Sequence, residues 1–227
     1  MIRKFLQVAA LAAAVLAAAL PIIPARAAGP ATPNPEAKPM DLTHTALLII
    51  DIQNDYFPGG AFELEGSEAA AGQARAALDL FRERGLAVVH VRHESVRPGS
   101  TFFLPGTPGA DIHPLVAPAP GEAVVRKHFP NSFRETDLQA KLQALGVQRL
   151  VVAGMMTLMC VDATVRAAAD LGYGVTVLSD ACAARGLEFS GEKVPAAQVH
   201  AAFLAALGMV YAQVEPTAAF LAQARGE

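Results

Sequence analysis

Short, uninterrupted apolar segments alternate along this chain with longer segments of helical periodicity. Residues 46–51 (ALLIID) are apolar up to the final carboxylate, which is typical of a strand buried on both faces of a parallel sheet. We predict strands at residues 46–51, 86–91, 123–126, 149–153, 174–178 and 209–213, and helices at residues 68–85, 136–145, 160–171, 195–207 and 217–224. This order predicts an α/β fold, a three-layer, doubly wound six-stranded parallel sheet with helices on both faces.

Composition narrows the class of protein further. The chain has 227 residues, of which 53% are hydrophobic, a share that excludes a disordered chain. A formal net charge of −3 gives no reason to expect nucleic acid as a partner. Two cysteines are too few for a disulfide scaffold or a four-thiolate zinc site. A small-molecule ligand is therefore expected.

The N-terminus has the organisation of a Sec-type secretory signal. Arg3 and Lys4 precede an apolar run at residues 8–20, and Ala25-Arg26-Ala27 has the A-x-A form of a cleavage site. We predict a signal peptide over residues 1–28, a Pro-rich linker over 29–40 and a single domain over 41–227. The protein is then expected to be periplasmic or secreted, without stable membrane association once the signal is cleaved. Retention of the segment as an anchor is the alternative.

The predicted strand ends place reactive side chains at one edge of the sheet, where parallel sheets bind their ligands. These are Asp51, His93, Lys127 and the turn that ends at Cys160. A thiol at the start of a helix lies at the positive end of the helix dipole, which favours the thiolate. The alternatives are a buried packing role for Cys160, a disulfide between Cys160 and Cys182, and a solvated surface role for Lys127. Residues 95–121 are rich in Gly and Pro, and we interpret them as a long, functional loop.

Three motifs together resemble the isochorismatase-like cysteine hydrolases, a family that includes nicotinamidases, N-carbamoyl amide hydrolases and ureidoacrylate-type amidohydrolases. They are Asp51-Ile52-Gln53-Asn54-Asp55-Tyr56-Phe57, then Arg126-Lys127 followed by Asn131-Ser132-Phe133, and the turn and helix start GMMTLMCVDAT at residues 154–164. The resemblance covers about residues 42–214.

The resemblance implies a catalytic triad and a reaction. Asp51 would be the general base, Lys127 would pair with it, and Cys160 would attack a carbonyl carbon. A cis peptide bond would join Met155 and Met156, and the backbone amides of Met156 and Cys160 would bind the oxyanion. The implied reaction cleaves a small amide or carbamoyl C–N bond through a thioester, without a cofactor, in a homo-oligomer. The same triad acting on an ester or lactam, or a catalytically idle binding member of the fold, are the alternatives.

Two differences from members of the family limit which of their properties can be expected in this chain. Residues 91–95 (VRHES) lack the Asp-x-His metal motif of nicotinamidases, so no bound metal is expected and nicotinamide is a poor substrate candidate. True isochorismatases cleave a vinyl ether and lack the cysteine. His93 is interpreted either as a satisfied loop histidine or as a substrate contact, and Gln53 and Thr157 as substrate contacts or as braces of Asp51. An aromatic wall is expected from some of Tyr56, Phe57, Phe102, Phe103 and Phe133. The substrate-binding candidates are Gln53, Phe57, His93, Phe133, Thr157 and Leu158.

Overall fold

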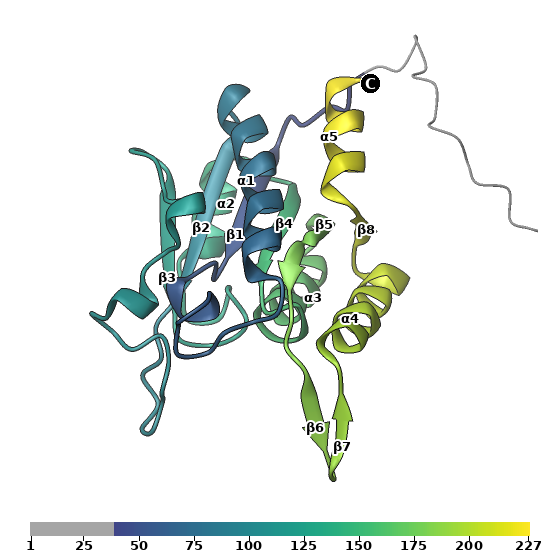
Figure 1. The fold of residues 1–227 in the computed structure, drawn as a ribbon. Coiled ribbons are helices and arrows are strands. Elements are labelled where there is room, and N and C mark those ends of the chain that lie inside the picture. The colour runs from purple at the N-terminus through teal and green to yellow at the C-terminus, as the bar shows by residue number, and fades with distance from the viewer. Residues whose placement is uncertain (1–38) are drawn as a thin grey trace, which may run out of the picture. The chain divides into compact units, whose positions relative to one another are not determined.

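The computed structural model describes residues 39–227, which form a sheet of six parallel strands. The strands lie in the order β3-β2-β1-β4-β5-β8 (Figure 1). Their bounds are β1 Thr45–Ile50, β2 Ala87–His93, β3 Ala123–Lys127, β4 Arg149–Met155, β5 Gly174–Ala183 and β8 Gln213–Glu215. The predicted α/β class and doubly wound topology are confirmed.

Alternate residues of β1 pack on opposite faces of the sheet, and each face has its own helices. Leu47 and Ile49 belong to one apolar cluster with residues of α1 and α5, whereas Leu48 and Ile50 belong to a second cluster with residues of α2, α3 and α4. The helices are α1 Ser67–Glu83, α2 Leu138–Ala144, α3 Asp162–Asp170, α4 Ala196–Val210 and α5 Thr217–Arg225. Burial on both faces explains why β1 is apolar at every position.

The strand order reverses between β1 and β4, and this reversal determines where a ligand can bind. From β1 the chain builds outward through β2 and β3, then returns to place β4 on the other side of β1. The crevice beyond the carboxyl ends of two such strands is the usual ligand site of a doubly wound sheet. Gly154 allows the close approach there, because a Cβ at that position would lie 2.2 Å from the carbonyl oxygen of Ile50.

One predicted strand is wrong, and another is longer than predicted. Residues 209–213 do not form a strand, because α4 continues to Val210 and the last strand, β8, begins at Gln213. Met209 and Val210 are 82% and 80% exposed, and a short apolar run by itself does not distinguish the end of a helix from a strand. β5 also extends five residues beyond its predicted end, from Leu178 to Ala183.

A second, two-stranded sheet was not predicted. β6 (Leu187–Phe189) and β7 (Glu192–Val194) form an antiparallel hairpin that follows β5 and precedes α4 (Figure 1). Its turn is Ser190-Gly191, with φ of 52° and 84°. A Ser-Gly pair is a turn signal, but the flanking strands are too short and too polar to show a periodic pattern.

The predicted loop at residues 95–121 is ordered and contains two short 3-10 helices, Pro108–Ala110 and Pro114–Val116. The predicted signal peptide and most of the predicted linker lie outside the described residues. Within residues 39–227, no helix combines the length and apolar character that crossing a membrane requires.

Candidate active site

Asp51 directly follows β1, at the point where the strand order reverses. Its backbone adopts a left-handed conformation with φ of 50°, which is uncommon for a residue with a side chain. Its amide donates to the carbonyl of Val91, and its carboxylate is completely buried. The end of β1 therefore positions a charged group inside the protein, where it needs a partner of opposite charge.

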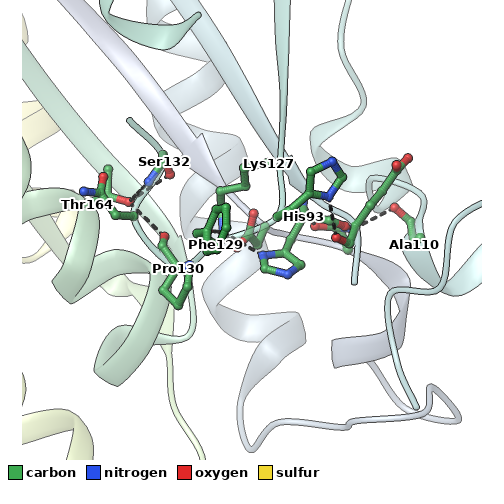
Figure 2. A network of polar contacts seen from close by, with 12 residues as sticks. His93, Ala110, Lys127, Phe129, Pro130, Ser132 and Thr164 are labelled. Carbon is green, nitrogen blue, oxygen red and sulfur yellow. Dashed lines mark hydrogen bonds and ion pairs between the residues drawn. The ribbon is translucent and has the colours of Figure 1, made fainter. Parts of the chain in front are cut away.

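Lys127, the last residue of β3, supplies that partner. Its side chain is also completely buried, and Nζ lies 2.7 Å from Asp51 Oδ2. Nζ also lies 3.0 Å from His93 Nδ1 and 3.1 Å from the carbonyl oxygen of Phe129, so three acceptors surround an ammonium that has three protons (Figure 2). Burial by itself would lower the pKa of Lys127, but Asp51 and Cys160 outweigh it and the pKa is raised. Lys127 is therefore an ammonium at neutral pH.

Cys160 lies close to this ion pair. Its thiol, a carboxylate oxygen of Asp51 and a ring nitrogen of His93 are all within 4.8 Å of one another. Cys160 belongs to a π-helical turn, Thr157–Val161, which leads into α3. The structure thus brings Asp51, Lys127 and Cys160 together from three separate strand ends, and Cys160 and Cys182 are both free thiols.

The electrostatic expectation for Cys160 is wrong. The sequence predicted a thiol at the start of a helix with a favoured thiolate, whereas Cys160 lies inside the π-helical turn and is only 4% exposed. Burial, followed by the charge of Asp51, raises the pKa of Cys160, and Lys127 compensates only in part. The resting side chain is therefore a neutral thiol whose proton must be removed during the reaction.

The turn before Cys160 has one backbone feature that the family resemblance implied. The peptide bond between Met155 and Met156 is cis. The carbonyl of Met156 accepts hydrogen bonds from the amides of Met159 and Val161, which close the π-helical turn. The amide of Met156 itself has no acceptor within residues 39–227.

A hydrogen-bonded brace joins the segment after β3 to α3. Ser132 donates from its amide to Thr164 Oγ1 at 3.0 Å, and the two hydroxyl groups lie 2.8 Å apart. Thr164 Oγ1 also donates to the carbonyl of Pro130, as the left part of Figure 2 shows. Both side chains are fully buried. This brace holds the strand that ends in Lys127 against the helix that follows Cys160.

A cavity of about 350 Å³ opens at Cys160. Aromatic side chains form much of its wall, with Tyr56 4.6 Å from Phe103 and Phe62 stacked at 4.3 Å on Phe102 between ring centroids. The other lining residues are His93, Ser95, Val96, Arg97, Ser100, His128, Pro130, Met156 and Met159. The cavity therefore combines an apolar wall with a few polar groups, as small-molecule sites usually do.

Of the substrate-binding candidates, only His93 lines this cavity. Gln53 is fully buried, and its side-chain amide bonds to the backbone of His93 and Ala110. Thr157 is also buried, with its hydroxyl donating to the carbonyl of Ala183 and lying 2.9 Å from His200 Nδ1.

The three apolar candidates also lie away from the cavity. Phe57 stacks on His113 at 3.7 Å, Phe133 packs on Tyr173 at 6.0 Å, and Leu158 is part of the apolar core. These residues were suggested by the motifs in which they stand. Phe57 follows the 3-10 helix Asn54–Tyr56 and Leu158 lies in the π-helical turn, and a motif alone does not determine which way such a side chain points.

Most of the lining comes from residues that the sequence did not single out. Val96, Arg97 and Ser100 lie on the loop after β2, and Phe62 lies between β1 and α1. The only signal was the length and composition of the 95–121 segment, which indicated a functional loop but not which of its side chains point inward.

Asp51, His93 and Cys160 also form a potential metal-ligand cluster. The ammonium of Lys127 already lies between the Asp51 carboxylate and the His93 ring, in hydrogen-bond contact with both. A divalent cation bound there would have to displace or repel this charge. The side chains of Asp51, His93 and Cys160 are therefore better suited to surround the Lys127 ammonium than to bind a metal ion.

Comparisons with known proteins show the family to which the chain belongs. Residues 45–204 match the family model of the Isochorismatase domain. The isochorismatase family protein YddQ of Bacillus subtilis is 52% identical over 177 residues, which are 78% of this chain and 98% of that protein. A crystal structure of an isochorismatase hydrolase from Oleispira antarctica is 55% identical with a TM-score of 0.76, covering 78% of this chain and 96% of that one.

Some curated relatives carry more specific names, such as streptothricin hydrolase and ureidoacrylate amidohydrolase. The ureidoacrylate amidohydrolase RutB of Stutzerimonas stutzeri is 32% identical over 194 residues, which cover 71% of this chain and 77% of that protein. The fold, the match over residues 45–204 and the high identity to YddQ lead to the same conclusion. The chain belongs to the isochorismatase family of hydrolases.

Proposed function

We propose that this protein is a cysteine hydrolase that cleaves a small-molecule amide or carbamoyl C–N bond through a thioester intermediate. One observation carries the proposal, namely a thiol at the cavity within 4.8 Å of a buried carboxylate that is paired with an ammonium. The thiol supplies a nucleophile, the carboxylate a base, and the ammonium a fixed positive charge.

The first step forms the covalent bond. Asp51 takes the proton from Cys160 Sγ as the sulfur attacks the substrate carbonyl carbon, and the carbonyl π electrons move to the oxygen. Among the described residues the Met156 amide is an unused donor at the cavity, and it is suited to bind this oxyanion with the Cys160 amide. Because the thiol pKa is raised, the proton leaves during the attack rather than before it.

The second step releases the amine. The tetrahedral intermediate collapses, the C–N bond breaks, and the nitrogen leaves with the proton held by Asp51. Water then attacks the thioester carbonyl and gives its proton to Asp51, and the C–S bond breaks. The Cys160 thiolate regains the proton, and the acid leaves. Lys127 keeps its proton throughout, because its three donors are occupied and its pKa is raised.

The comparisons support hydrolysis of C–N bonds in this family, since one relative is named a ureidoacrylate amidohydrolase. The small volume of the cavity, about 350 Å³, supports a small substrate rather than a protein chain.

The test is a panel of primary amides, carbamoyl amino acids, esters and lactams, assayed for release of ammonia and acid. Cys160→Ala should abolish turnover with the fold intact, whereas Cys182→Ala, the matched control at a buried thiol outside the cavity, should keep it. Trapping of an acyl adduct on Cys160 by mass spectrometry would identify the thioester. Activity confined to esters would refute the C–N assignment, and turnover by Cys160→Ala would refute the nucleophile.

We further propose that the protein acts in the periplasm or outside the cell, on the basis of the signal-like residues 1–28, and that it forms a homo-oligomer. Cell fractionation with and without these residues tests the location. Light scattering on the purified protein tests the assembly, and a monomer at all concentrations would contradict the second proposal.

A further inference from the structure

The ring of His93 has one nitrogen whose protonation state the structure determines. Nδ1 lies 3.0 Å from Lys127 Nζ, and an ammonium has protons but no lone pair. Lys127 must therefore donate and Nδ1 must accept. An acceptor nitrogen carries no proton, so the proton of a neutral ring lies on Nε2.

The surroundings keep this ring neutral. Burial lowers the pKa of His93 to about 4, and the positive charges of Lys127, His128 and Arg97 act in the same direction while Asp51 opposes them. At neutral pH the ring is consequently uncharged, with one tautomer selected by the neighbouring ammonium.

The Nε2 proton is not used inside the protein. No residue within 39–227 accepts a hydrogen bond from His93 Nε2, although the ring lines the cavity at Cys160. Because Nδ1 points to the buried Lys127, the opposite side of the ring is the side that reaches the cavity. His93 thus offers an N–H donor to whatever binds there.

Gln53 fixes the position of this donor. Its side-chain oxygen accepts from the His93 amide at 2.8 Å, and its side-chain nitrogen donates to the His93 carbonyl at 2.9 Å. The second proton of this nitrogen goes to the carbonyl of Ala110 at 2.7 Å. Gln53 is fully buried, so both backbone groups of His93 are held by a rigid clamp.

The charge of the lining indicates what the donor binds. Arg97 is the only permanently charged side chain that lines the cavity among the described residues, and no carboxylate lines it. His128 is the second histidine of the lining, and its Nδ1 lies 2.8 Å from the carbonyl oxygen of Glu94. An anionic group in the cavity would meet an N–H donor and a guanidinium, while the nearest carboxylate, that of Asp51, is already paired with the Lys127 ammonium.

We propose that His93 is a substrate-binding residue that donates from Nε2 to a carboxylate of the substrate, with Arg97 as the second contact. The inference rests on the proposed function, and it names the substrate class as small amides or carbamoyl compounds that carry a carboxylate. Tyr56, Phe102 and Phe103 line the same cavity, so an apolar part of the substrate would contact their rings.

The first experiment needs no turnover. Nitrogen-15 NMR of histidine-labelled protein at pH 7, with the His93 signals assigned by their loss in His93→Gln, should show a protonated Nε2 and an unprotonated Nδ1. The signals should stay unchanged down to about pH 5, because the pKa is about 4. A ring protonated at Nδ1, or a charged ring at pH 7, would overturn the proposal.

The second experiment measures binding in the Cys160→Ala background. The probes are 4-carbamoylbenzoate and the neutral 4-methylbenzamide, which have similar size, and the method is calorimetry. We expect the carboxylate probe to bind at least about tenfold tighter, as a charge-assisted hydrogen bond predicts. His93→Leu and Arg97→Gln should each remove most of this preference. His93→Gln should keep it in part, because the glutamine side chain has both an acceptor for Lys127 and a donor.

The outcomes separate the two proposals. A carboxylate preference in binding, with no hydrolysis of any amide or carbamoyl compound of the panel by the wild-type protein, would refute the proposed function and leave the binding role of His93 intact. Hydrolysis of both probes with equal affinity, or the absence of binding by both, would overturn the role of His93 and the substrate class. Thermal unfolding of each variant controls for loss of the fold.

Discussion

Replacing Lys127 by methionine should destabilise the protein strongly, because it leaves the buried carboxylate of Asp51 unpaired. Both side chains are completely buried and their charged atoms lie 2.7 Å apart. At an effective dielectric constant of about 20, this separation corresponds to about 6 kcal/mol of attraction, which offsets the cost of removing two charges from water.

The magnitude follows from what each substitution leaves behind. Lys127→Met removes the attraction but keeps the desolvated carboxylate, so we expect a loss of about 3–5 kcal/mol in the free energy of unfolding. In the double variant, Asp51→Asn with Lys127→Met, neither charge remains and the expected loss is below about 2 kcal/mol. The second substitution should thus restore stability that the first removed.

Urea unfolding at pH 7, followed by circular dichroism, measures these differences, since the chain has no tryptophan to serve as a fluorescence probe. The three variants and the wild type form a double-mutant cycle with a large coupling energy. A loss below about 1 kcal/mol for Lys127→Met, or additive losses in the cycle, would show that Asp51 and Lys127 do not form the buried pair. All three variants should lack hydrolytic activity.

Three further predictions concern other parts of the site. The pKa of His93 falls to about 4 on folding from an ordinary value of 6.5, so its contribution to stability is complete above about pH 6.5 and is lost as the pH falls toward 4, up to about 3 kcal/mol. His93→Gln should reduce this acid dependence of the free energy of unfolding in urea. An unchanged dependence would contradict the pKa shift. Asp55 holds the aromatic wall, because its carboxylate accepts from the Phe103 amide at 2.6 Å. In Asp55→Ala, KM should therefore rise more than kcat falls. Steady-state kinetics that show an effect on kcat alone would contradict this role. Gly154→Ala would place a Cβ 2.2 Å from the carbonyl oxygen of Ile50. Thermal unfolding should therefore show a loss above about 3 kcal/mol in the free energy of unfolding, or the protein should not fold. A near-normal melting temperature would refute the close approach of the two strands.

The neutral state of the Cys160 thiol bears on how easily the nucleophile is oxidised. A thiol with a raised pKa is a poor target for oxidants, because the thiolate is the reactive form. An exported enzyme with this site would keep its nucleophile reduced better than one with a preformed thiolate. Activation then depends on the contact with Asp51, which is present only in the folded chain.

Local sequence was sufficient for the fold and for the catalytic candidates. Five of the six strands lie where continuous apolar runs predicted them, since a strand buried on both faces must be apolar along its length. Asp51 and Lys127 could be found because a polar residue directly after or at the end of such a run lies at the sheet edge where ligands bind. The failure at residues 209–213 has the same origin, because Met209 and Val210 are apolar but belong to the exposed end of α4.

The tertiary structure decided which side chains reach the substrate and how they are charged. Gln53 and Thr157 adjoin catalytic positions in the sequence yet point into the protein, whereas Arg97 and Phe62 reach the cavity from segments far from Cys160 along the chain. The pKa of Cys160 and the tautomer of His93 depend on burial and on charges from other strands, which no local pattern encodes. Sequence fixes periodicity and strand ends because these are local properties, while contacts and electrostatic fields arise only when distant segments pack together.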